Sequence, residues 1–556
     1  MTGWRRYVAA GVVVLGVYVG LAFLNSPRGF LGTDTGGKVA TLEVMTARGQ
    51  FDPDLGYWAA SSDPDGRLYP LAFTTHTASG KWVNVTTLPA LWAGWQLYRV
   101  GGYRLALLVP MAGSLAAALA GLALFRRLGV RSDASAWAGF FILALASPLT
   151  IYALDFWEHS LGVALLAWAV VVLVDALGTF RWWRFAAAGA LLGAAATMRT
   201  EALVYLGVAG IAAIVPLARF GDGAPRRRGL LAIGAGLVLL ASAAAPVLAN
   251  ELVERRVVGD SVRSTRIAGT ARGLGDVPTD RVGEAAITLV GLEGSDRGIA
   301  LGVVFAALLV FAAIRRDRGL GIVAVAAAGV VAAVRVAAGG LGFVPGLAAA
   351  WVLPPSAFGR AHAGIPVSAR PNERGFVVAV GLGAVPIVLA TQLRGGAAPQ
   401  WAGRYLLVSG FLLAVVGVAA LESRPPTLRA AVVVLAAAVT AFGLLWTSVR
   451  THDVARTVAA LERRPEPVLV SGVYHLAREG GATYGRKRWL TLADHRAAPA
   501  RAAAVLGDEG IDSFASVEQT PTPEPAYPGF HPTAHTTLRL FDGVDLRVTS
   551  WRSDAP

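Results

Sequence analysis

The segment from Gly29 to Gln50, GFLGTDTGGKVATLEVMTARGQ, follows the first apolar run of the chain and sets an acid, Asp34, beside a glycine-rich turn and Lys38. From Lys38 to Arg48, apolar side chains recur at helical spacing. This pattern predicts a short amphipathic helix that lies along a membrane face and does not cross it. An acid and a cation one helical turn apart at the lipid–water boundary indicate a functional site. The rest of the chain is interpreted as the scaffold that positions this loop.

Composition places the 556-residue chain among polytopic α-helical membrane proteins. It is 55% hydrophobic and 15% charged, whereas soluble proteins carry roughly 25% charged residues. Many apolar runs reach the approximately 20 residues that span a bilayer. The net charge is +14, but most arginines stand at the ends of apolar runs, where they act as topology signals, so nucleic-acid binding is not expected. The chain has no cysteine, which excludes disulfides and thiolate chemistry.

The apolar runs and the arginines at their ends predict about thirteen membrane crossings, with the N-terminus cytoplasmic and the C-terminus extracytoplasmic. Arg5 and Arg6 precede an apolar run without a cleavage pattern, which indicates an uncleaved anchor. Two long outer loops are expected over 25–98 and 250–297. Helices are expected over 7–24, 103–125, 134–155, 160–177, twice within 185–220, 229–248, 298–314, twice within 318–360, 376–393, 406–421 and 430–446.

The apolar stretch 185–220 must cross the membrane twice. One helix of that length would be roughly 54 Å long, against a hydrocarbon core of about 30 Å. Its only polar break contains Arg199 and Glu201. These two side chains are therefore expected at the outer end of a helix pair.

From about residue 448 the composition changes. Short β-type runs alternate with the helical sequence ARAAAVLGDEG over 500–510, which predicts a small α/β domain outside the membrane. The expected organisation is a membrane module over 1–447 and an extracytoplasmic domain over 448–556. No phosphate-cradling glycine loop occurs in that domain.

Under this topology, four polar clusters reach the same outer face. Each cluster alone is explained by an interfacial cap, since charges near a bilayer cost about 2–4 kcal/mol when deep and less at the interface. Convergence of all four favours a site for a lipid phosphate and a proton acceptor. The clusters are Asp34 with Lys38; Asp155, Glu158 and His159; Arg199 with Glu201; and Trp401, Arg404 and Tyr405.

The first outer loop holds two of the three lysines, Lys38 and Lys81. A compact ammonium suits a phosphate oxygen, although chance placement on a solvated loop explains them equally well. The pairs Asp52-Pro-Asp54 and Asp63-Pro-Asp65 are interpreted as turns in preference to Mg²⁺, Mn²⁺ or Ca²⁺ ligands. A divalent metal is therefore possible but not implied, no metal ligand is assigned, and no cofactor is required.

The arrangement resembles the GT-C superfamily of membrane glycosyltransferases, which use polyprenyl-phosphate sugars. It looks most like the branch with protein O-mannosyltransferases, aminoarabinose transferases and actinobacterial envelope transferases. The resemblance covers roughly residues 1–450 and rests on Asp34 followed by a surface helix. It also rests on WVNVTTLPALWAGWQLYRVGG (82–102), GALLGAAATMRTEALVYL (189–206) and QWAGRYLL (400–407).

The resemblance implies that Asp34 is the catalytic base and that Glu158 matches an acid of the second outer loop. Arg199 and Arg404 would lie near the donor phosphate. Thr35 follows Asp34, so the paired Asp-Glu of some protein mannosyltransferases is absent and a protein acceptor is less secure.

The expected function is inverting sugar transfer from a polyprenyl-phosphate donor to an envelope glycan, lipid or protein. It would take place at the outer face of the plasma or inner membrane, among membrane lipids. The alternatives are a transporter or flippase of a lipid or small solute, and a noncatalytic anchor. Against a transporter, the charges cluster at one face, with Arg335 the main exception.

Overall fold

The computed structural model describes residues 3–84, 87–218, 225–262, 371–391, 401, 403–422, 425–492, 498–539 and 545–554. The helices expected over 298–314 and 318–360, and most of the loop expected over 250–297, lie outside these ranges. In the described part, seven helices are long and apolar enough to cross a membrane. This confirms the predicted class, a polytopic helical membrane protein with a C-terminal α/β domain.

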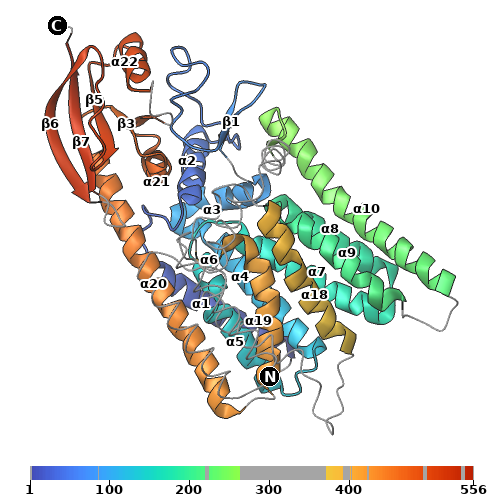
Figure 1. The fold of residues 1–556 in the computed structure, drawn as a ribbon. Helices are drawn as coiled ribbons and strands as arrows, with labels where there is room; N and C mark the ends of the chain where they lie inside the picture. Colours follow the sequence, from blue (N-terminus) through green and yellow to red (C-terminus); the bar gives the residue numbers. More distant parts are fainter. Residues whose placement is uncertain are drawn as a thin grey trace.

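The membrane helices run side by side along most of their length (Figure 1). Small residues allow close approach, as expected between helices in lipid: a Cβ at Gly189 or Gly193 of α8 would lie 2.2 or 2.1 Å from a carbonyl oxygen of α10. The helices are α1 (Gly3–Ala22), α4 (Leu108–Arg127), α5 (Asp133–Leu145), α6 (Pro148–Tyr152), α7 (His159–Thr179), α8 (Trp182–Met198), α9 (Ala202–Ala218), α10 (Pro225–Val258), α18 (Pro371–Thr391), α19 (Leu407–Leu421) and α20 (Pro426–Glu462).

Several predicted boundaries are wrong for identifiable reasons. The helix expected over 103–125 is divided: residues 103–106 are the last turn of α3 (Leu88–Ala106), which is kinked at Gly101 and Gly102, and α4 begins at Leu108. The helix expected over 134–155 divides into α5 and α6, because Pro148 starts a new helix. The helix expected to end at residue 446 continues through residue 448 to Glu462.

The predicted break at Arg199 and Glu201 is confirmed, since α8 ends at Met198 and α9 begins at Ala202. The opposite ends of the helices carry the arginine clusters. There Arg6 and Arg126 each pair with Asp133 at 3.0 Å, across α1, α4 and α5. The polar break and the arginine-rich ends therefore lie at opposite ends of the helices.

At the end of the helices that carries the polar break, the first loop and the C-terminal domain lie together. The loop contributes α2 (Thr33–Arg48), β1 (Thr74–His76) and β2 (Trp82–Asn84). The domain contributes β3 (Val468–Ser471), α21 (Leu476–Glu479), η2 (Gly481–Thr483), β4 (Arg488–Thr491), α22 (Ala498–Asp508), β5 (Ser513–Gln519), β6 (Phe530–Arg539) and β7 (Asp545–Ser553). The sheet order is β4-β3-β5-β7-β6, with β3 parallel to β4 and β5, and β7 antiparallel to β5 and β6.

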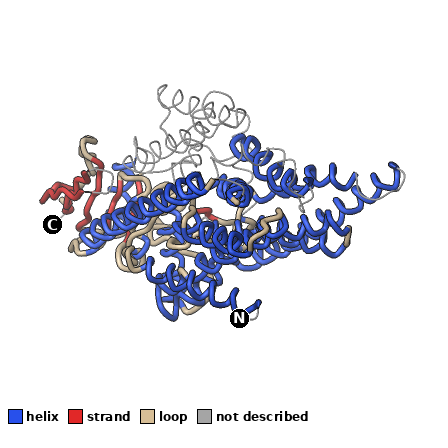
Figure 2. The backbone as a smooth tube through the Cα atoms, turned by 90° about the horizontal axis from the view of Figure 1, so that it is seen from below, coloured by secondary structure: helices blue, strands red, loops and turns tan. Residues whose placement is uncertain are grey.

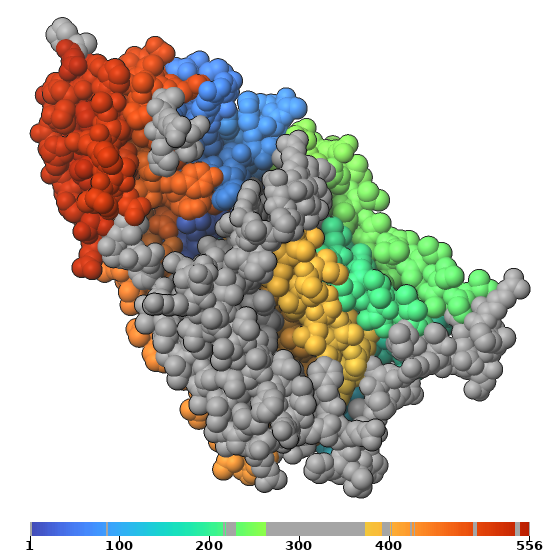
Figure 3. Space-filling model, viewed as in Figure 1, coloured from blue at the N-terminus to red at the C-terminus, as the bar shows by residue number. Residues whose placement is uncertain are grey.

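These strands gather near the C-terminus (Figure 2), at the end of α20 (Figure 1). The sheet shares a hydrophobic core with the first loop, in which Ala59 and Leu68 pack with Val468 and Leu490. The two surfaces adjoin in the space-filling view (Figure 3). The first loop and the C-terminal domain thus form one packed layer over the ends of the helices.

Glu518, at the end of β5, provides a pH test of this layer. The carboxyl faces Gly472, where a Cβ would lie 1.8 Å from Glu518 Oε2. Burial raises the pKa of Glu518 to about 7, despite the nearby Arg547. The folded state therefore keeps a proton that the unfolded chain has lost, and this group removes stability as the pH rises from about 4.5 to 7.

Glu518→Gln should abolish that loss. We expect the variant to match the wild type at pH 4 and to exceed it at pH 8 by up to about 3 kcal/mol in free energy of unfolding. Thermal unfolding of the purified protein across this pH range measures the difference. Asp512→Asn, at an exposed acid of the same domain, is the control, and an equal pH response in both variants would contradict the prediction.

Candidate active site

Helix α2 begins earlier than the sequence predicts, and it is not the amphipathic surface helix expected, because every residue from Thr35 to Leu42 is buried. It starts at Thr33, after Gly32 in extended conformation, and therefore includes Asp34 in its first turn. An acid is favoured there because the helix dipole is positive at its N-terminus. Lys38 lies one turn further along the same helix, so both charged groups are fixed by one rigid element.

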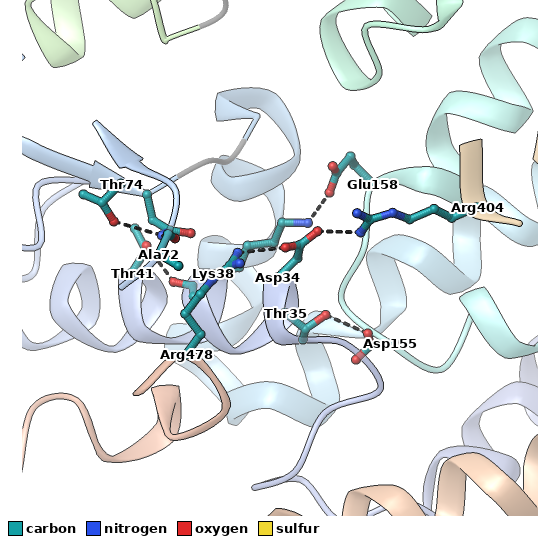
Figure 4. A network of polar contacts seen from close by, with 12 residues as sticks. Asp34, Thr35, Lys38, Thr41, Ala72, Thr74, Asp155, Glu158, Arg404 and Arg478 are labelled. Carbon is teal, nitrogen blue, oxygen red and sulfur yellow. Dashed lines mark hydrogen bonds and ion pairs between the residues drawn. The ribbon is translucent and has the colours of Figure 1, made fainter. Parts of the chain in front are cut away.

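The carboxylate of Asp34 lies between two guanidinium groups (Figure 4). Arg404, in η1 (Arg404–Leu406) before α19, donates from Nη1 to Oδ2 at 2.8 Å. Arg478, in α21, donates from Nη2 to Oδ1, also at 2.8 Å. Burial alone would raise the pKa of Asp34, but Arg404 and Arg478 outweigh it and hold the pKa well below its usual range. Asp34 is therefore ionised in this arrangement.

Beside Asp34, a second chain of charges extends from Lys38. The Lys38 ammonium donates to Glu158 Oε2. Arg199 Nη1 donates to Glu158 Oε1 at 3.3 Å, and Arg199 Nε donates to Glu201 Oε1 at 2.8 Å. Burial would raise the pKa of Glu158, but Lys38 and Arg199 hold it well below its usual range. This chain joins α2, the start of α7 and the α8–α9 break.

Asp155 is a buried acid under α2. It accepts from Thr35 Oγ1 at 2.6 Å and from Tyr103 OH at 2.9 Å. Burial raises its pKa to about 6, although both hydrogen bonds favour the charged form. Asp155 therefore anchors the first turn of α2 to α3 and to the segment before α7.

Aromatic rings surround the cations. Tyr405 packs against Arg404 and Arg199, whose Cζ atoms lie 4.8 and 5.3 Å from its ring centroid. His159 lies against Tyr152 and Trp157, with centroids 5.3 and 4.9 Å away. Neither ring nitrogen of His159 has a hydrogen-bond partner among the described residues.

A small cavity of about 10 Å³, with room for about one water molecule, adjoins the Lys38–Glu158 pair. Apart from these two charged side chains its walls are apolar. It is lined by Lys38, Ala90, Leu91, Val109, Phe156, Trp157, Glu158 and Leu161. A charged group is thus placed at the edge of an apolar space.

The structure brings most of the predicted site residues together. One connected cluster contains Asp34, Lys38, Glu158, His159, Arg199, Glu201, Arg404 and Tyr405. Trp401 touches it through its backbone, because its carbonyl accepts from Tyr152 OH at 2.7 Å. Its ring packs at Gly443 of α20.

Lys81 makes its contacts elsewhere. It bonds to both oxygens of Asp52 at 3.0 Å and to the Val257 carbonyl at 2.9 Å. The interpretation of the aspartate–proline pairs as turns is confirmed for Asp63-Pro64-Asp65, where Gly66 N–H donates to the Asp63 carbonyl at 2.9 Å, whereas Asp54 forms a β-bridge with Val83. Across the described ranges, no group of three His, Cys, Asp or Glu side chains has a geometry that could hold a metal ion.

Sequence reasoning missed Arg478, and it named Asp155 as a member of a polar cluster without giving it a role. Arg478 lies 444 positions from Asp34 in the chain, and the C-terminal domain offered no recognisable motif. The available signal was Gly480-Gly481 directly after Arg478-Glu479. A Cβ at Gly481 would lie 1.9 Å from the Gly36 carbonyl oxygen, so this glycine marks close approach to α2.

No family model and no curated protein matches the chain. Among solved structures, the apo oligosaccharyltransferase of Archaeoglobus fulgidus matches with a TM-score of 0.45 and 13% identity, over 92% of this chain and 69% of that one. ArnT of Cupriavidus metallidurans bound to undecaprenyl phosphate matches with a TM-score of 0.40 and 15% identity, over 99% and 98%. These proteins are GT-C glycosyltransferases, the superfamily that the sequence resembles. Similarity at this level assigns neither an activity nor the role of a residue.

Proposed function

We propose that the chain transfers a sugar, with inversion, from a polyprenyl-phosphate donor to a cell-envelope glycan, lipid or protein at the extracytoplasmic membrane face. One observation carries the proposal. At one end of the membrane helices the Asp34 carboxylate binds Arg404 and Arg478, and beside it Lys38 and Arg199 bind Glu158 at the edge of a small apolar cavity. A lipid phosphate needs cations at the membrane surface, and an attacking hydroxyl needs a proton acceptor.

In this proposal the cations hold the donor phosphate. Guanidinium forks suit phosphate oxygens, and they stabilise the charge that develops as the phosphate leaves the sugar. Arg404 and Arg199 would supply forks, and Lys38 a compact charge.

Asp34 is the proposed base, and its surroundings make it dependent on the donor. While Arg404 and Arg478 both bind its carboxylate, its affinity for a proton is low. A donor phosphate would compete for the same guanidinium groups. Asp34 would then gain proton affinity only with the donor in place, which favours transfer over unproductive proton uptake.

The test uses purified protein, a labelled sugar on polyprenyl monophosphate and envelope fractions as acceptor. We expect label in an envelope acceptor together with release of polyprenyl phosphate. A transporter or flippase would instead move the intact labelled lipid across vesicle membranes. Movement without cleavage of the sugar–phosphate bond would overturn the proposal. Arg335, the main charge that favoured the transporter alternative, lies outside the described residues.

Glu158→Gln should separate positioning from proton transfer. Glutamine keeps the shape of the side chain but lacks the negative charge of Glu158 that pairs with both Lys38 and Arg199. The buried Lys38 ammonium would then have no counter-ion. We expect a loss of about 3 kcal/mol in stability and a milder loss of transfer than for Asp34→Asn. Glu251→Gln on α10 serves as control. A larger loss of transfer for Glu158→Gln than for Asp34→Asn would make Glu158 the base and Asp34 the positioning residue.

The orientation is part of the proposal. The arginine-rich helix ends should be cytoplasmic, with the N-terminus, while the site and the C-terminal domain lie outside. Reporters active only outside the cytoplasm should work when fused after Ser553 and fail after Gly223. The reverse pattern would contradict the proposed face of the site.

A further inference from the structure

Three aromatic side chains form a surface beside Arg478, and the proposed reaction gives these three side chains no role. Phe73, from the first loop, faces Tyr474 and His475 of the C-terminal domain, with ring centroids 6.3 and 6.2 Å away. Tyr474 and His475 are 4.6 Å apart. The exposed fractions of Phe73 and Tyr474 are 52% and 43%. We call Phe73, Tyr474 and His475 the aromatic platform.

Phe73 is held in an unfavourable backbone conformation. Its φ is +62°, in the left-handed region that a bulky residue rarely adopts. The preceding carbonyl, of Ala72, accepts from Asn84 Nδ2 at 3.2 Å, which ties the loop to β2. Such outliers persist where the surrounding structure enforces them and cluster at ligand sites. Here the result is an aromatic ring kept at the surface.

Arg478 connects the platform to Asp34. Its Cζ lies 5.3 Å from the Phe73 ring centroid while its Nη2 binds Asp34. The side chain is 1% exposed, yet Nε and Nη1 have no hydrogen-bond partner within the described ranges, and neither does His475 Nδ1. Buried donors without partners are costly. The platform therefore borders unpaired polar atoms, one guanidinium away from the carboxylate.

We propose that the aromatic platform binds a sugar ring of the acceptor, so that the acceptor class is a glycan. A pyranose or furanose presents a face of C–H groups that stacks on aromatic rings, and an edge of hydroxyls that pair with N–H and imidazole groups. The platform and Arg478 offer both kinds of contact side by side. A lipid chain would leave the unpaired nitrogens unsatisfied.

This inference rests on the proposed function and specifies its acceptor. With the ring on the platform, one acceptor hydroxyl is directed to Asp34. Its oxygen forms the bond to the anomeric carbon as the bond from that carbon to the phosphate oxygen breaks. The electron pair leaves with the phosphate, and the hydroxyl proton goes to Asp34.

The experiment compares Tyr474→Ala with Tyr474→Phe in full-length enzyme. The probes are a labelled sugar on polyprenyl monophosphate and three acceptor fractions of the producing cell's envelope: polysaccharide, lipid and protein. We expect label in the polysaccharide. Tyr474→Ala should raise the half-saturating polysaccharide concentration by about five- to tenfold, with the donor KM unchanged and Tyr474→Phe within about twofold of wild type.

Phe73→Gly is a second variant, because glycine accepts a positive φ. It should weaken polysaccharide use as Tyr474→Ala does, without lowering the midpoint of thermal unfolding. Label in the lipid or protein fraction instead of the polysaccharide, or Tyr474→Ala with wild-type saturation, would overturn the platform's role and leave the proposed function standing. Failure of the wild type to label any fraction would refute the proposed function itself.

Discussion

Asp34→Asn should lower sugar transfer by about 10²–10⁴-fold, the usual contribution of a general base. Asparagine keeps the shape of the side chain but cannot accept the hydroxyl proton. Arg404 and Arg478 would be released from the carboxylate to bind a donor phosphate, so donor binding should persist. Transfer, lipid binding and thermal unfolding are measured on the same preparation.

Asp52→Asn is the matched control, because Asp52 is an aspartate of the same loop that pairs with Lys81, outside the cluster. It should leave transfer near wild type. Near-normal turnover in a folded Asp34→Asn protein would end the proposed mechanism. A loss of donor binding in step with turnover would instead assign Asp34 to holding the donor site together.

The second large effect is expected at the contact between α2 and the C-terminal domain. A Cβ at Gly36 would lie 1.7 Å from the Arg478 carbonyl oxygen. Because that contact is with backbone, no side chain can move to relieve it. Gly36→Ala should therefore displace α21 from α2, separate Arg478 from Asp34, lower stability by about 1–3 kcal/mol and reduce transfer at least tenfold.

Gly481→Ala attacks the same contact from the other side and should behave alike, since its Cβ would lie 1.9 Å from the Gly36 carbonyl. Gly485→Ala is the control, because nothing lies within 4 Å of a Cβ there. Limited proteolysis of the C-terminal domain and thermal unfolding report the displacement. Equal behaviour of Gly481→Ala and Gly485→Ala would show that the contact tolerates a methyl group.

Much of the membrane part could be predicted because it depends on local patterns. The length of the apolar stretch 185–220 required a break, and the only polar residues within it marked the place. The split at Pro148 was missed, although the proline, which lacks an amide donor, was a signal for it. The contact of Arg478 with Asp34 was not readable, because it depends on how a distant domain docks and leaves no periodic trace in either segment.

The helix α20 has a mechanical consequence. Its 37 residues run unbroken from the membrane part to the C-terminal domain, a length of roughly 55 Å. About two thirds of the way along it, Arg450 Nε donates to the Leu31 carbonyl at 2.7 Å, and Gly29 packs against the Thr451 carbonyl. The helix therefore also holds the segment that leads into α2. A flexible connection would let Arg478 occupy many positions relative to Asp34, whereas this rigid helix holds Arg478 close to Asp34. If α20 tilts within the bilayer, the C-terminal domain moves with it and the distance between Arg478 and Asp34 changes. Because helix tilt depends on bilayer thickness, turnover should respond to bilayer thickness.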